Sequence, residues 1–133
     1  MSVWTHVAAI FRVDSIRGLF PPPKFDEVFG KECLFESGAE VWNDVDKHPE
    51  NYLPMGSEGS LQKSVWVNPE SCHLAAYTVS VFGDLRDYDD VQAIVEWFKD
   101  KCAKVRIRQA CITVECENGN SALVKYEEKE AFE

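Results

Sequence analysis

Residues 77–126 constrain the fold more than any other part of this chain. Alternating apolar side chains predict a strand over residues 77–82, and a polar loop follows it. Apolar side chains then recur at the spacing of one helix face over residues 91–102. A second β-branched segment leads to Asn118-Gly119, which is typical of a hairpin turn. This order of patterns predicts a helix packed across an antiparallel sheet.

Other segments predict further strands of the same sheet. Residues 3–14 have bulky side chains at both parities, which favours a central strand. Residues 61–67 alternate as a strand, and shorter strands are predicted at residues 33–35 and 39–42. A short helix is predicted over residues 25–29, before a glycine.

The length of 133 residues is that of one domain with a core of its own. We expect a single α+β domain over residues 1–133, of a ferredoxin-like or related plait type. It would have a mostly antiparallel sheet of about five or six strands, with one main amphipathic helix packed on one face. Residues 43–60 predict a long surface excursion, the polar loop is expected at residues 83–87, and residues 127–133 form a charged tail. Exposed strand edges in so small a sheet favour a homo-oligomer.

Composition excludes several classes of protein. The formal net charge of −9 argues against binding to a nucleic-acid backbone, which requires many Lys and Arg side chains. No segment approaches the ~20 apolar residues that cross a bilayer, and the N-terminal residues lack the pattern of a signal peptide. The 5 cysteines, an odd number, fit small thiols in a reducing compartment. We therefore expect a cytoplasmic protein that does not bind membranes.

The sequence lacks the motifs of the common catalytic and metal sites. The acids at residues 84–90 lack the spacing of a calcium loop and are explained as caps of the following helix. The cysteines never form a C-x-x-C pair, and no nucleophile elbow, phosphate loop or dinucleotide fingerprint occurs. We expect no metal, no cofactor and no catalytic residue. A small enzyme that depends on His6 or on a cysteine is kept as an alternative.

The paired arginines suggest a binding site. Arg106 and Arg108 are two residues apart on a predicted strand, so their side chains leave the same face. The apolar parity of this strand switches between Arg108 and Ala110, which predicts a β-bulge. The alternative is that both arginines belong to a solvated strand end and balance nearby acids.

Aromatic side chains indicate the same kind of surface. Phe82 lies at the polar parity of its strand and close to Arg86, and Trp4 and Trp66 also oppose the apolar parity of their strands. Such a composition is typical of a protein interface. It also suits a base stacked on an aromatic ring, with the phosphate bound by arginine.

Three segments resemble small bacteriophage-encoded accessory proteins. These are Trp-Thr-His-Val at 4–7, Met-Gly-Ser-Glu-Gly-Ser at 55–60 and Phe-Gly-Asp-Leu-Arg-Asp at 82–87. The resemblance covers most of the chain and implies a compact, acidic protein in the cytosol of an infected cell. It also implies an anti-defence role, because such proteins commonly bind a host defence protein or its nucleotide messenger.

Two hypotheses follow. The first is a non-enzymatic binding protein that sequesters a small anionic nucleotide through the following residues: Phe82, Arg86, Arg106 and Arg108. The second is an acidic, anti-CRISPR-like inhibitor that mimics nucleic acid and covers the basic groove of a host defence protein. Its contacts would be these residues: Asp44, Asp46, Glu50, Glu58 and Trp66.

Overall fold

The computed structural model describes residues 2–16, 23–69 and 74–127. The elements, in chain order, are β1 (Trp4–Ile16), α1 (Phe25–Val28), α2 (Ala39–Lys47), the 3₁₀ helix η1 (Pro49–Asn51), β2 (Met55–Gly56), β3 (Gly59–Ser60), β4 (Gln62–Pro69), β5 (Leu74–Arg86), α3 (Val91–Lys104), β6 (Ile107–Cys116) and β7 (Ser121–Glu127).

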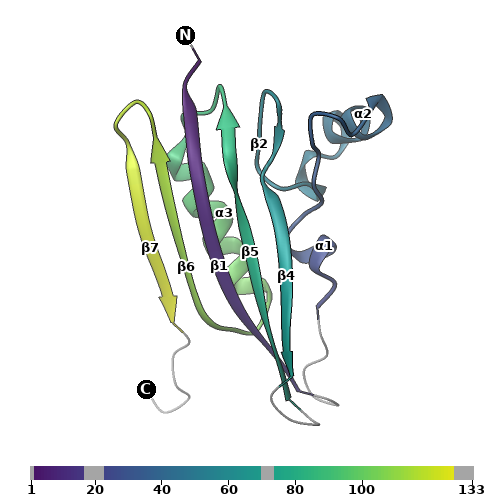
Figure 1. The fold of residues 1–133 in the computed structure, drawn as a ribbon, viewed down its shortest axis with the longest axis vertical. Helices are drawn as coiled ribbons and strands as arrows, with labels where there is room; N and C mark the ends of the chain where they lie inside the picture. The colour runs from purple at the N-terminus through teal and green to yellow at the C-terminus, as the bar shows by residue number, and fades with distance from the viewer. Residues whose placement is uncertain (1, 17–22, 70–73, 128–133) are drawn as a thin grey trace.

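The main sheet has 5 strands in the order β4-β5-β1-β6-β7, and every neighbouring pair is antiparallel. The strands β2 and β3 form a separate hairpin. Figure 1 shows α3 crossing one face of the main sheet, with α1 and α2 beside the β4 edge. The prediction of an α+β fold with a mostly antiparallel sheet and one main helix is confirmed.

The central strand β1 organises the core. It pairs with β5 along its whole length and with β6 from Thr5 to Val13, so both of its edges are hydrogen-bonded. Its odd-numbered residues face α3 and are buried, and the Phe11 ring lies 5.2 Å from the ring of Phe98 and 4.9 Å from that of Phe29. The predicted central strand is confirmed, and α1 and α3 pack on the same side of the sheet through Phe11.

The helix α3 follows the predicted apolar spacing. The Asp90 carboxylate accepts a hydrogen bond from the Ala93 N–H at 3.0 Å, so it caps the helix as expected from the acids before it. Ile94, Phe98 and Cys102 are buried against the sheet. A carboxylate cap and an apolar stripe at helical spacing therefore fix both the start and the buried face of α3.

Three local predictions are wrong. No strand forms at residues 33–35, and residues 39–42 begin α2 instead of a strand. This segment is helical because its apolar side chains pack on Cys33 and Tyr52 as one face of a helix. The loop predicted at residues 83–87 also differs, since β5 continues to Arg86. Residues 83–86 pair with residues 4–7 of β1, and this long-range pairing overrides the local turn signal.

Residues 43–60, predicted as a long surface excursion, contain the end of α2, η1, β2 and β3. The segment has a small core of its own, in which Cys33, Val45 and Tyr52 are buried. The β2–β3 hairpin lies against the end of β5, where a Cβ at Gly56 would be 2.5 Å from the carbonyl oxygen of Arg86. Glycine at this position therefore permits the close backbone approach that joins the hairpin to the sheet.

The ring cluster at Phe11 predicts a large difference between two phenylalanine substitutions. Phe11→Ala removes a fully buried ring and should lower the free energy of unfolding by about 3–5 kcal/mol. Phe82→Ala, on the exposed face, should change it by about 0.5 kcal/mol or less. Urea unfolding of both variants measures the difference, and equal losses would contradict the assignment of faces.

Candidate functional site on the open sheet face

The face of the main sheet opposite α3, here called the open face, is not covered by any helix of the described residues (Figure 1). Four large apolar side chains on it remain exposed: Ile10 at 45%, Trp66 at 60%, Phe82 at 41% and Leu123 at 68%. An exposed apolar surface spread over one side of a small protein is typical of a binding surface. The open face is therefore the candidate functional site.

The strand register arranges the open face in rows that cross the sheet. One row contains, from β4 to β6, Trp66, Thr78, Arg12 and Gln109. The next row contains, from β4 to β7, Ser64, Ser80, Ile10, Cys111 and Lys125. These rows bring together side chains from segments that are far apart in the sequence.

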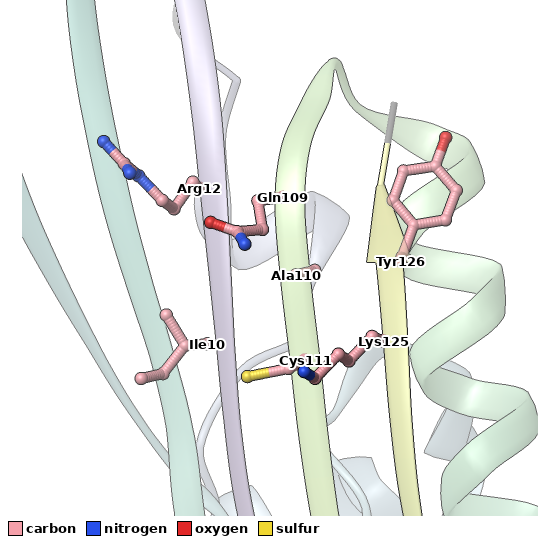
Figure 2. A pocket seen from close by; sticks show the side chains of 7 residues that line it. All are labelled: Ile10, Arg12, Gln109, Ala110, Cys111, Lys125 and Tyr126. Carbon is pink, nitrogen blue, oxygen red and sulfur yellow. The ribbon is translucent and has the colours of Figure 1, made fainter. Parts of the chain in front are cut away.

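A hollow of about 300 Å³ lies on this face over β1, β6 and β7. Its lining residues include Ile10, Arg12, Gln109, Cys111, Lys125 and Tyr126. Figure 2 shows Gln109 turned toward β1 and the Arg12 side chain directed toward β5. The hollow thus has the Lys125 cation and the Gln109 amide beside an apolar floor, with the Arg12 cation at its β5 rim, a composition suited to a ligand with an anionic and an apolar part.

The predicted β-bulge is confirmed beside this hollow. Arg12 pairs with Gln109 but Val13 pairs with Ile107, so Arg108 is the extra residue. Arg108 Nε donates a hydrogen bond to Asp14 Oδ2 at 2.9 Å, and the N–H of Asp14 donates to the carbonyl oxygen of Arg106 at 3.2 Å. The bulge therefore places both predicted arginines at the end of the sheet where Arg12 lies. We call this region, with Arg12, Arg106, Arg108 and Lys125, the basic end.

Most of the basic side chains near the sheet have acidic partners. Lys63 pairs with Asp26, Arg86 pairs with Glu58, and Arg108 pairs with Asp14. By contrast, Arg12 and Lys125 make no ion pair with any residue that the structure describes, although both are exposed. In a chain of formal charge −9, these two cations remain available for an anion.

The four residues predicted to bind a nucleotide do not form one site. Arg86 pairs with Trp4 at one end of β1, whereas the bulge lies nine residues further along, at a distance of about 30 Å. Arg86 is also bound to Glu58, and its Nε donates to the hydroxyl of Ser2 at 2.9 Å. Phe82 lies between these ends, opposite Ala8. Only Arg106 and Arg108 lie together.

The residues of the predicted inhibitor surface are also dispersed. Glu58 pairs with Arg86, which lies about 26 Å along β5 from Thr78, the strand partner of Trp66. Asp44 accepts a hydrogen bond from the Tyr52 hydroxyl at 2.6 Å, and this bond raises the pKa of Tyr52 to about 12.

Two acids of the predicted inhibitor surface, Asp46 and Glu50, are exposed on the segment that contains α2 and η1. The five residues predicted for a partner do not form one continuous patch, because Glu58 and Trp66 lie beside β5 residues that are eight positions apart.

The other end of the open face is acidic. His6 Nδ1 lies 2.6 Å from Asp84 Oδ1, and His6 Nε2 lies 3.5 Å from Glu117 Oε2. The hydrogen bond to Asp84 raises the pKa of His6, and Glu117 adds to this effect. Glu115 is the β6 partner of His6. We call this region, with His6, Asp84, Glu115 and Glu117, the acidic end.

The alternative of an enzyme depended on His6 or on a cysteine. His6 has two carboxylate neighbours, but no cysteine of the described residues is hydrogen-bonded to it. Burial raises the pKa of Cys102 to about 11, which keeps this thiol protonated at neutral pH. No group of three or more His, Cys, Asp or Glu side chains in the described ranges is placed to hold a metal ion.

Three residues that line the hollow were not predicted as members of a site: Arg12, Gln109 and Lys125. Arg12 could have been identified from the sequence, because it is a charged residue at the polar parity of a predicted central strand. The partners of Arg12 could not be inferred, because they depend on the order of the strands and on the register at the bulge.

No protein-family model, curated protein or solved structure matches this chain. None of the helices among the described residues is long and apolar enough to span a membrane.

The acidic end predicts a pH-dependent contribution to stability. Because the pKa of His6 is raised above its ordinary value of 6.5, the protonated ring stabilises the folded state. This stabilisation is complete below the ordinary pKa and is lost as the pH rises through the raised one. His6→Gln should therefore lower the melting temperature more at about pH 6 than at about pH 9.

The control for this prediction is the same substitution in an Asp84→Asn background. Removing the carboxylate removes the largest cause of the raised pKa, so the pH dependence of the His6→Gln effect should be smaller. An effect of His6→Gln that is the same at both pH values would show that the ion pair does not contribute.

Proposed function

We propose that this protein is a non-enzymatic binding protein that captures a small anionic, nucleotide-type ligand at the basic end of its open face. The observation that supports this proposal is the pair Arg12 and Lys125, two exposed cations that line one hollow and have no ion-pair partner among the described residues. Arg12 and Lys125 replace Arg86 as the proposed phosphate contacts, and Arg108 is a neighbouring cation.

The row that contains Arg12 offers a place for a base. Trp66 and Arg12 are separated by one strand, so their Cα atoms lie about 10 Å apart. The indole of Trp66 is exposed on the same face as the guanidinium. A nucleotide bound through its phosphate at Arg12 could stack its base on Trp66, an interaction that tolerates any base.

The proposed binding depends on short-range contacts. The whole chain repels anions, but at physiological salt the charges beyond ~8–10 Å are largely screened. Charge-assisted hydrogen bonds from Arg12 and Lys125 act within this distance. A compact ligand is therefore favoured over an extended nucleic acid, whose backbone would also meet the acidic end.

A second candidate function is inhibition of a protein partner that covers the open face. The observation that favours it is the exposure of Ile10, Trp66, Phe82 and Leu123 on one surface. Aromatic and arginine side chains are enriched in protein interfaces. Either function is compatible with the predicted anti-defence role of a phage accessory protein in the cytoplasm of its host, which stays a prediction.

We also propose that the fold is a variant of the ferredoxin-like plait. The elements β1, β4, β5, α3 and β6 have the order strand, strand, strand, helix, strand, and the sheet order β4-β5-β1-β6 is that of a plait. In this proposal α1 stands in the place of the first plait helix. The strand β7 is an additional edge strand.

The ligand proposal predicts a specific pattern in a nucleotide panel followed by thermal shift. A ligand at 100 times its dissociation constant should stabilise the protein by ~2.7 kcal/mol. Arg12→Ala and Lys125→Ala should each cost ~1.5–3 kcal/mol of binding free energy, because each removes a charge-assisted hydrogen bond. Titration calorimetry measures this as a rise of about 10–100-fold in the dissociation constant.

Lys47→Ala is the matched control, since Lys47 is an exposed cation on α2, outside the main sheet. It changes the net charge equally and should leave binding unchanged. No stabilisation by any nucleotide, or equal losses in Arg12→Ala and Lys47→Ala, would contradict a site at the basic end. Binding of a host protein that is lost in Ile10→Lys would instead support the second candidate.

A further inference from the structure

The two edges of the main sheet differ in character. Figure 1 shows β4 and β7 as the outer strands. In β4, three consecutive apolar residues are exposed: Val65, Trp66 and Val67. Natural proteins usually protect a long apolar edge with charges, prolines or a covering element. The edge of β7 has such protection in the exposed Lys125, whereas residues 64–67 of β4 have no charged side chain.

The backbone groups on the outer edge of β4 are unpaired in the part of the chain that the structure describes, and α1 and α2 lie beside this edge. Within those residues, β5 is the only strand that pairs with β4, and no other backbone hydrogen bond joins residues 62–69 to another segment. The one basic residue of this strand, Lys63, points its ammonium group into the protein, where it contacts Asp26 and donates to the carbonyl oxygen of Gly30 at 2.8 Å. The outer edge is therefore apolar and close to neutral.

We propose that β4 pairs antiparallel with the β4 strand of a second copy of this chain, about a twofold axis that passes beside Trp66. An axis perpendicular to the sheet keeps the two open faces on the same side, so residues of equal parity must face each other. With the axis at Trp66, each Val65 faces Val67 of the partner subunit on the side of α3.

This register makes the strand complementary to itself. Trp66 faces its symmetry mate on the open face, and valine faces valine on the other side. A twofold axis at Val65 would instead place Lys63 opposite a valine. The register also places no like charges directly opposite each other, because β4 has no acidic residue and its one cation, Lys63, is paired with Asp26. The two 5-stranded sheets would then form one continuous sheet.

The proposed dimer shares only Trp66 with the proposed ligand contacts and does not use the two cations. Val65 and Val67 point toward the α3 side of the sheet, whereas Arg12 and Lys125 lie on the open face. Assembly and ligand binding can therefore be tested by separate substitutions.

Sedimentation velocity of the full chain across micromolar to millimolar concentrations tests the assembly. We expect wild type to reach twice the mass of 15.1 kDa. In Val65→Lys the dimer dissociation constant should rise about tenfold or more, because a charge would meet a valine of the partner. Leu123→Lys is the matched control, because it also replaces an exposed apolar residue by lysine, on the opposite edge strand, and should leave the dimer intact.

Disulfide cross-linking tests the register even if Val65→Lys folds poorly. At the proposed axis the two Cβ atoms of residue 66 lie ~4.5–5.5 Å apart, close enough for a disulfide in Trp66→Cys. In Ser64→Cys the two thiols are offset by four residues, or ~13 Å, and should not cross-link. Peptide mass spectrometry identifies the linked position against the native cysteines.

Three results would overturn the proposal. These are a wild-type protein that stays monomeric at every concentration, a dimer that persists in Val65→Lys, and cross-linking of Ser64→Cys equal to that of Trp66→Cys. A dimer that is lost in Ile10→Lys but not in Val65→Lys would place the interface on the open face instead.

Discussion

The structure depends on the fact that a single long helix covers a sheet of 5 strands. With 14 residues, α3 is about 21 Å long, enough to cover one face of β1, β6 and β7. The short helix α1 completes this layer through Phe29 and Phe25, which reach Phe11 and Tyr77. No helix of the described residues covers the other face, and apolar side chains on that face therefore remain exposed.

The strand register places the acidic and the basic side chains of the open face at opposite ends of β1. The acidic residues around His6 lie where β1 begins, whereas Arg12 and the bulge at Arg108 lie toward its other end. Between these ends, Ile10 and Phe82 are exposed and apolar. The charge of the open face therefore changes sign along the strands. An anion and a cationic surface would be attracted to different ends of the same sheet.

Local sequence patterns were sufficient for the elements whose signals come from neighbouring residues. The cap at Asp90, the apolar stripe of α3, the hairpin at Asn118-Gly119 and the parity switch after Arg108 all depend on residues within a few positions. The same reasoning failed where distant residues decide. Residues 83–86 remain extended because β1 pairs with them, and residues 39–42 are helical because Cys33 and Tyr52 provide a surface to pack on. The arginines followed the same rule, since Arg108 was predicted on a strand and Arg86 in a loop, whereas their places at opposite ends of one sheet depend on the pairing of distant strands.

The strand β4 connects the two proposals because its alternate residues belong to different surfaces. Trp66 lies in the row of Arg12 on the open face, while its neighbours Val65 and Val67 lie on the side of α3. If two copies pair at this edge, their two tryptophans meet beside the axis, and each basic end lies two strands away from it. A ligand that stacks on Trp66 would then contact the junction between the subunits. Ligand affinity and dimer stability would consequently depend on each other, because any ligand that prefers the paired tryptophans must stabilise the dimer by the same free energy.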